Sequence, residues 1–101
     1  MDRRLELHKI LCDVLGSREV YYQSPESTRM SYPAIVYSRS DIVNEFADNN
    51  VYMQSHEYEV IVMDYNPDSK IVDAVSKLPT ARFNRHYASD NLNHDVFTLI
   101  Y

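Results

Sequence analysis

The sequence predicts a single α+β domain with a mixed or antiparallel five-stranded sheet and both helices packed on one face. Two segments have apolar residues at helical spacing, and five have the composition or alternation of strands. Their order is helix, three strands, helix, two strands. The 101 residues suffice for one core, whereas two half-length domains would each bury too little surface to be stable. We therefore expect residues 1–101 to form one domain.

The first helix is predicted over residues 5–15. Its apolar residues recur every three or four positions, which places them on one helical face. Gly16 follows directly, and glycine is the residue best suited to the left-handed conformation that ends many helices. The apolar face consists of Leu7, Ile10, Leu11, Val14 and Leu15.

Two strands are predicted to follow. Residues 19–23 are rich in strand formers and end at Ser24-Pro25, where proline removes a backbone donor. Residues 25–31 are polar and favour turns. Tyr32-Pro33 then favours an extended entry into the second strand, at residues 34–38.

Residues 41–50 show little periodicity and are predicted to form an acidic loop that reaches beyond the sheet. The candidate site in this loop consists of Asp41, Glu45 and Asp48. Because no apolar pocket is predicted around them, an ordinary solvated surface is the alternative interpretation.

A third strand is predicted at residues 52–65, and its later half is apolar on both faces, which is typical of a central strand. Asn66 is then the predicted cap of a second helix, with Pro67 at its first position. This helix is expected to run to Leu78 and to end at Pro79. Residues 81–88 and 93–101 are predicted to form a hairpin around residues 89–92.

The sequence offers little for catalysis. Histidines at positions 8, 56, 86 and 94 lack the paired spacing of metal ligands, and one glycine is too few for a phosphate-binding loop. Cys12 is predicted to be a small packing residue of the first helix. His94 and Asp95 are adjacent, but neighbours on a strand point to opposite faces, unlike a catalytic base and its partner. We expect no catalytic residue, no metal and no cofactor.

The charge balance disfavours nucleic-acid binding. With 15 acidic and 10 basic residues, the chain has a formal charge of −5 and no basic surplus for a phosphate backbone. A single cysteine excludes an internal disulfide and favours assembly in a reducing cytoplasm. No apolar run approaches the ~20 residues that span a bilayer, so no membrane partner is expected. Nine tyrosines, mostly on predicted strands, suit both sheet packing and subunit contacts.

Several segments, in this order, resemble a family of short tail-terminator, or tail-completion, proteins encoded in the head and tail gene clusters of long-tailed phages and prophages of Gram-positive bacteria. The resemblance covers most of the chain. The segments are SYPAIVY (31–37), FADN (46–49), YEV (58–60), DYNPDS (64–69), LP (78–79) and DNLNHDVFTL (90–99).

The resemblance implies a non-enzymatic virion subunit that forms a ring, of six copies, at the head-proximal end of the tail tube. Its partners would be itself, the tail tube protein and the head-tail connector or stopper protein, with DNA passing through the lumen without specific binding. The acidic residues at positions 41, 45 and 48 would face that lumen. The polar residues of the last turn would brace the hairpin or contact a neighbouring subunit, and they are Asp90, Asn91, Asn93, His94 and Asp95.

Three other functions stay open. A head-completion or stopper protein, located in the neck between portal and tail, would also form a ring but would bind the portal side. A small hydrolase or host-directed regulator would need a pocket with a matched set of titratable groups. A single-strand nucleic-acid binder would show strongly salt-dependent binding.

Overall fold

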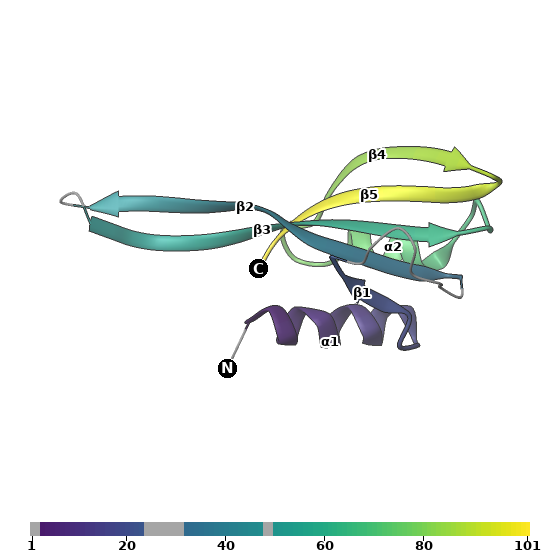
Figure 1. The fold of residues 1–101 in the computed structure, drawn as a ribbon, viewed down its shortest axis with the longest axis horizontal. Helices are drawn as coiled ribbons and strands as arrows, with labels where there is room; N and C mark the ends of the chain where they lie inside the picture. Colours follow the sequence, from purple (N-terminus) through teal and green to yellow (C-terminus); the bar gives the residue numbers. More distant parts are fainter. Residues whose placement is uncertain (1–2, 24–31, 48–49) are drawn as a thin grey trace.

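The computed structural model describes residues 3–23, 32–47 and 50–101 and has the predicted α+β fold, with two helices and one five-stranded sheet (Figure 1). The order of elements is also the predicted one. The elements are α1 (Arg3–Leu15), β1 (Val20–Tyr22), β2 (Ala34–Ala47), β3 (Asn50–Asp64), α2 (Lys70–Ser76), β4 (Arg82–Ser89) and β5 (Leu92–Ile100).

The sheet is mixed, and its strands follow the order β1-β2-β3-β5-β4. Strand β1 runs parallel to β2, with Val20 opposite Ile35, and all other neighbours are antiparallel. Residues 57–63 of β3, which pair with β2 on one side and β5 on the other, are therefore central in the sheet, as their apolar sequence predicted. We call this part of the sheet, with the helices that cover it, the body. Strands β1 and β4 form the two edges.

Both helices pack against the same face of the sheet. In β3, Tyr58, Val60 and Val62 lie two residues apart, so their side chains point to one face, and all three are buried there. Each helix adds buried residues to this single core cluster: Leu7 and Leu11 from α1, and Val75 from α2. The sheet face opposite the helices has a smaller cluster around Ala34, Met63 and Leu92.

The end of α1 is as predicted, but the start of α2 is not. Gly16 has a φ of 79°, and its N–H donates to the carbonyl of Cys12 at 2.8 Å. Asn66, the predicted cap of α2, instead accepts from the backbone N–H of Asp68 in a local turn. Ser69 is the actual cap, and its hydroxyl accepts from the N–H of Ile71 at 3.3 Å. Because of the turn at Asn66–Asp68, the helix begins at Lys70, later in the chain than predicted.

The prediction of an acidic loop at residues 41–50 was wrong. Strand β2 continues to Ala47 and β3 begins at Asn50, so most of the segment is paired strand; residues 48–49 lie outside the described residues. The pairing shifts register between Arg39 and Asp41 and again between Glu45 and Phe46. Such irregularities interrupt the alternation that marks a strand in sequence.

The last hairpin forms as predicted, with ends shifted by one residue. Asp90 and Asn91 have φ values of 53° and 66°, the left-handed conformation of a two-residue hairpin turn. Neither described helix has the length and apolar character needed to cross a bilayer.

Candidate functional site: the arm and the end groove

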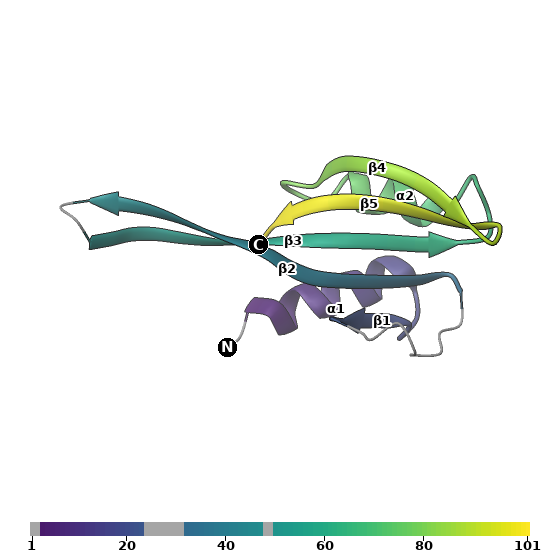
Figure 2. The same ribbon diagram turned by 45° about the horizontal axis from the view of Figure 1, so that its top comes forward.

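The far ends of β2 and β3 form a two-stranded arm, defined as Asp41–Ala47 with Asn50–His56. Strand β1 pairs with β2 only as far as Tyr37, and β5 leaves β3 where the Tyr101 N–H donates to the His56 carbonyl at 3.0 Å. Beyond these points, the arm has no third strand among the described residues. It extends past both helices in two views, along a molecule that measures 51 × 25 × 24 Å (Figures 1 and 2).

The helix-side face of the arm carries Ile42 and three polar residues, Asn44, Gln54 and His56. His56 precedes the buried Tyr58 by two residues and lies opposite Ile42, so these residues share the face on which the helices pack. Farther along that face, the Gln54 amide donates to the Asn44 side chain at 2.9 Å. Ile42 is 41% exposed.

The predicted acidic site lies in this arm. Asp41 is exposed, stands opposite Glu57 on the face away from the helices, and accepts from the N–H of Ile42 through its own carboxylate at 2.8 Å. Glu45 pairs through its backbone with Met53. Asp48 lies outside the described residues. A lumen-facing role for the three residues stays a prediction.

At the base of the arm lies a concave surface that we call the end groove, with a volume of about 650 Å³. Apolar residues dominate its lining, and the arm itself contributes Gln54 and Ser55. The groove is defined by Leu7, Ile10, Leu78, Pro79, Ile100 and Tyr101.

Thr80 fixes one wall of the end groove. Its hydroxyl donates to the Ile100 carbonyl at 2.7 Å and accepts from the Ile100 N–H at 3.0 Å. These bonds tie the loop after α2 to the end of β5. On the other side, the Tyr101 hydroxyl donates to the Glu6 carboxylate at 3.3 Å. Hydrogen bonds therefore connect the α2-β4 loop, the C-terminal end of β5 and α1 around the groove.

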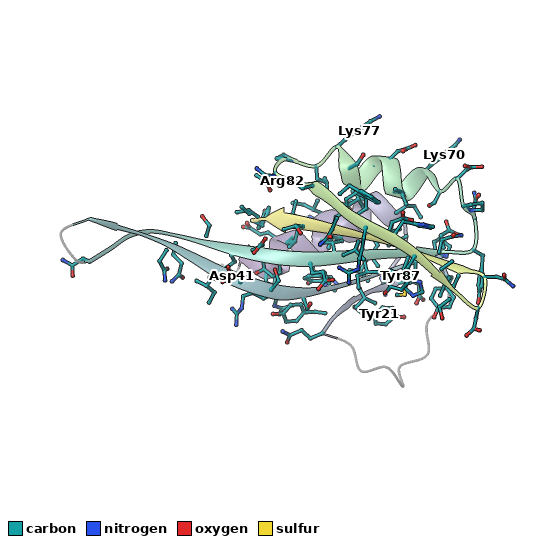
Figure 3. All side chains as sticks on the ribbon, turned by 90° about the horizontal axis from the view of Figure 1, so that it is seen from above. Tyr21, Asp41, Lys70, Lys77, Arg82 and Tyr87 are labelled. Atoms are coloured by element: carbon teal, nitrogen blue, oxygen red, sulfur yellow. The ribbon has the colours of Figure 1, made fainter. Side chains whose placement is uncertain are left out.

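Basic residues gather on the flank beside the groove. Residues 70–89 contain Lys70, Lys77, Arg82 and Arg85 against the single acid Asp73, although the chain as a whole is acidic. Lys77 and Arg82 flank Leu78, Pro79 and Thr80 in sequence, and Figure 3 places Lys70, Lys77 and Arg82 along the same side of the molecule. A second hollow, beside Arg82 and Phe83, adjoins the groove at Thr80 and Ile100 and also contains Glu57.

The polar residues of the last hairpin are bonded mainly within the domain. The His94 ring stacks on Tyr87, with ring centroids 4.6 Å apart, and its Nδ1 lies 3.1 Å from the Leu92 carbonyl. The Asn93 amide donates to the carbonyls of Asp64 and Tyr65 at 3.2 and 3.3 Å. These bonds connect the hairpin to the end of β3.

Asp90 and Asn91 form the tip of that turn, and Asp95 lies farther along β5. Burial raises the pKa of Asp95, and the nearby His86 and His94 partly oppose this shift. A subunit contact at Asp90, Asn91, Asn93, His94 and Asp95 stays a prediction.

No catalytic constellation is apparent among the described residues. No group of three or more His, Cys, Asp or Glu side chains in that part of the chain could hold a metal ion. Cys12 is half-buried, and burial, together with Asp13, raises the pKa of its thiol, which disfavours the nucleophilic thiolate. The Nδ1 of His8 lies 2.8 Å from the hydroxyl of buried Tyr37, where it supports packing.

The tyrosines divide between the core and the surface. Tyr37 and Tyr58 are buried in the core cluster, and Tyr22 packs on Tyr37 with ring centroids 5.0 Å apart. Tyr65 and Tyr87 are exposed. Sheet packing therefore accounts for part of the tyrosine content, and exposed rings remain for contacts with other molecules.

No protein-family model matches this chain, and no curated protein sequence is similar to it.

Little in the sequence indicates the end groove. Its lining residues lie in α1, the arm part of β3, the α2-β4 loop and the end of β5, so only the fold brings them together. Ile100 and Phe83 were interpretable as ordinary strand residues, yet both are large apolar side chains left exposed. The one sequence feature that pointed to this region was Pro79-Thr80, which marks a loop between the end of a helix and the start of a strand.

Proposed function

We propose that this chain is a structural, non-enzymatic subunit of a long-tailed phage particle that forms a six-membered ring at the head-proximal end of the tail tube. The ring ends tube growth and joins the tail to the head connector. The arm is the observation that carries this proposal. A ribbon that leaves its own domain with two open strand edges is suited to bind a further subunit.

The charge distribution supports the same role. A ring around DNA that must slide should not bind the phosphate backbone, and a net charge of −5 lowers that attraction. In this proposal, the acidic face of the arm, with Asp41, lies toward the channel. The resemblance of the chain to tail-terminator proteins supports the position at the tube end.

The test is electron microscopy of tails assembled with and without this protein. We expect tubes of irregular length in its absence, and tubes of uniform length with a cap at one end after the purified protein is restored. Normal tube lengths without the protein would contradict the proposal.

A stopper protein of the neck is the alternative, and a binding experiment separates the two roles. Purified protein is mixed with tail tubes or with DNA-filled heads that lack tails. A terminator subunit binds the tubes and not the heads, whereas a stopper subunit binds and seals the heads.

A further inference from the structure

We infer that the arm of one copy docks in the end groove of a second copy, with the Ile42 face of the arm against the apolar lining. This inference deepens the proposed function, because it names the surface through which ring subunits meet, and it rests on the ring being formed by this chain. The occupant of the groove is thus a second copy of the same protein.

The arm has no third strand beside it among the described residues. An isolated two-stranded hairpin is at best marginally stable in water. In both views the backbone of the arm leaves the region of the helices and of the other strands (Figures 1 and 2). On the arm, the described apolar side chain of Ile42 is 41% exposed. Contact with a second molecule would bury it.

The end groove offers a preformed apolar surface for Ile42 of a second copy. Its lining is mostly apolar, and the exposed side chain of Ile100, at 42%, lies in it. The bonds of Thr80 to both backbone groups of Ile100 hold the groove in place before any partner arrives. A preformed site loses less conformational entropy on binding than one that must first be ordered.

Charge also favours contact between the arm and the groove. Residues 41–56 contain three acidic residues and no lysine or arginine, whereas Lys77 and Arg82 flank residues 78–80 of the groove in sequence. Arg85, farther along β4, pairs with Glu59. Two copies that each carry a charge of −5 repel one another in most orientations, so the approach of an acidic arm to a basic flank is favoured. Asp41 lies on the face opposite Ile42, and docking therefore leaves it directed away from the groove.

The geometry is head-to-tail, because the two surfaces in contact are different. Repetition of a head-to-tail contact produces a closed ring when the rotation between copies closes. An exchange in which two copies bind each other's grooves would instead stop at a dimer.

Disulfide trapping between two marked proteins tests the docking. Both proteins carry Cys12→Ser; one adds Ile42→Cys and the other, with a size tag, adds Pro79→Cys. At the highest soluble concentration, mild oxidation should give the mixed product in at least several-fold excess over the same experiment with Ser17→Cys in place of Pro79→Cys. Ser17 is exposed at the end of α1 and outside the groove. Equal yields for the two pairs would overturn the inference.

Charge reversal is the second measurement. The double change Lys77→Glu and Arg82→Glu in the Pro79→Cys protein should lower the yield several-fold at low salt, and less at high salt because salt screens the attraction. Lys70→Glu with Asp73→Lys, which retains the net charge of α2, is the control and should leave the yield nearly unchanged. A loss in the control equal to that in the test variant would contradict the electrostatic argument.

The two proposals can fail separately. Trapped arm-groove products together with normal tails in the absence of the protein would leave the docking intact and refute the terminator role. Uneven tails without the protein, together with no excess of trapped product, would support the terminator role and refute the docking.

Discussion

Strands β2 and β3 each have two halves in different surroundings. In the body, β3 lies between β2 and β5, and its residues Tyr58, Val60 and Val62 are buried beneath the helices. In the arm, the same two strands continue, and among the described residues each pairs only with the other. A backbone ladder with two register shifts thus extends well beyond the core, although burial stabilises only part of it.

The backbone hydrogen bonds of the arm lie outside the core, and this affects how much they stabilise the arm. Net stabilisation by a backbone hydrogen bond is modest, since water competes for the same groups in the unfolded chain. Burial of apolar area supplies most of the favourable free energy in the body. We therefore expect the arm to open locally without unfolding of the body.

Hydrogen exchange of dilute protein should give the largest contrast between the two halves. Amides of β3 near Val60 and Val62 should exchange only through global unfolding, with an opening free energy in the range of about 5–15 kcal/mol. Amides of the arm near Asn44 and Gln54 should open at a cost near zero. Equal protection in both halves would show that the arm belongs to the cooperative unit, and protection that rises with protein concentration would support docking.

A pair of phenylalanine substitutions should give the next largest effect. Phe97 is fully buried in β5, and Phe83 of β4 lies opposite it but is 58% exposed. Phe97→Ala should lower the free energy of unfolding by about 3–5 kcal/mol through lost burial and a cavity. Phe83→Ala should lower it by about 0.5–1.5 kcal/mol, the value of an aromatic pair.

Denaturant unfolding measures both losses. If Phe97→Ala does not fold, Phe97→Leu serves in its place and should still cost more than Phe83→Ala. The reverse order would mean that the core does not lie on the helix side of β5.

The smallest predicted effect is the pH dependence from His8, which lies in α1. Desolvation, and then the positive charge of Arg4, lower the pKa of His8 below its ordinary value of 6.5. The unfolded chain therefore binds a proton more readily than the folded one, and His8 lowers stability as pH falls through 6.5.

The free energy of unfolding should accordingly decline less between pH 8 and pH 5 in His8→Asn than in the unmodified protein. The matched control is His56→Asn, at the base of the arm. Because the arm opens locally, this residue contributes little to the free energy of global unfolding. The pH dependence of stability in this variant should therefore follow that of the unmodified protein. An unchanged profile for His8→Asn would contradict the prediction.

The order of elements, the end of α1 and the last hairpin were predictable from the amino-acid sequence alone. These features depend on local chemistry: helical spacing of apolar residues, the left-handed Gly16, and a turn at Asp90 and Asn91. The start of α2 was misplaced because Asn66 serves a local turn about as readily as it serves as a helix cap.

The arm, the end groove and the parallel pairing of edge strand β1 depend on contacts between residues distant in sequence. The length of β2 depends on pairing with β3, and its register shifts conceal the two-residue alternation. The groove joins residues that are distant in sequence, so no local pattern marks it. Local chemistry fixes the end of α1 and the last turn, whereas long-range packing fixes how far β2 extends and which surfaces stay open for a partner.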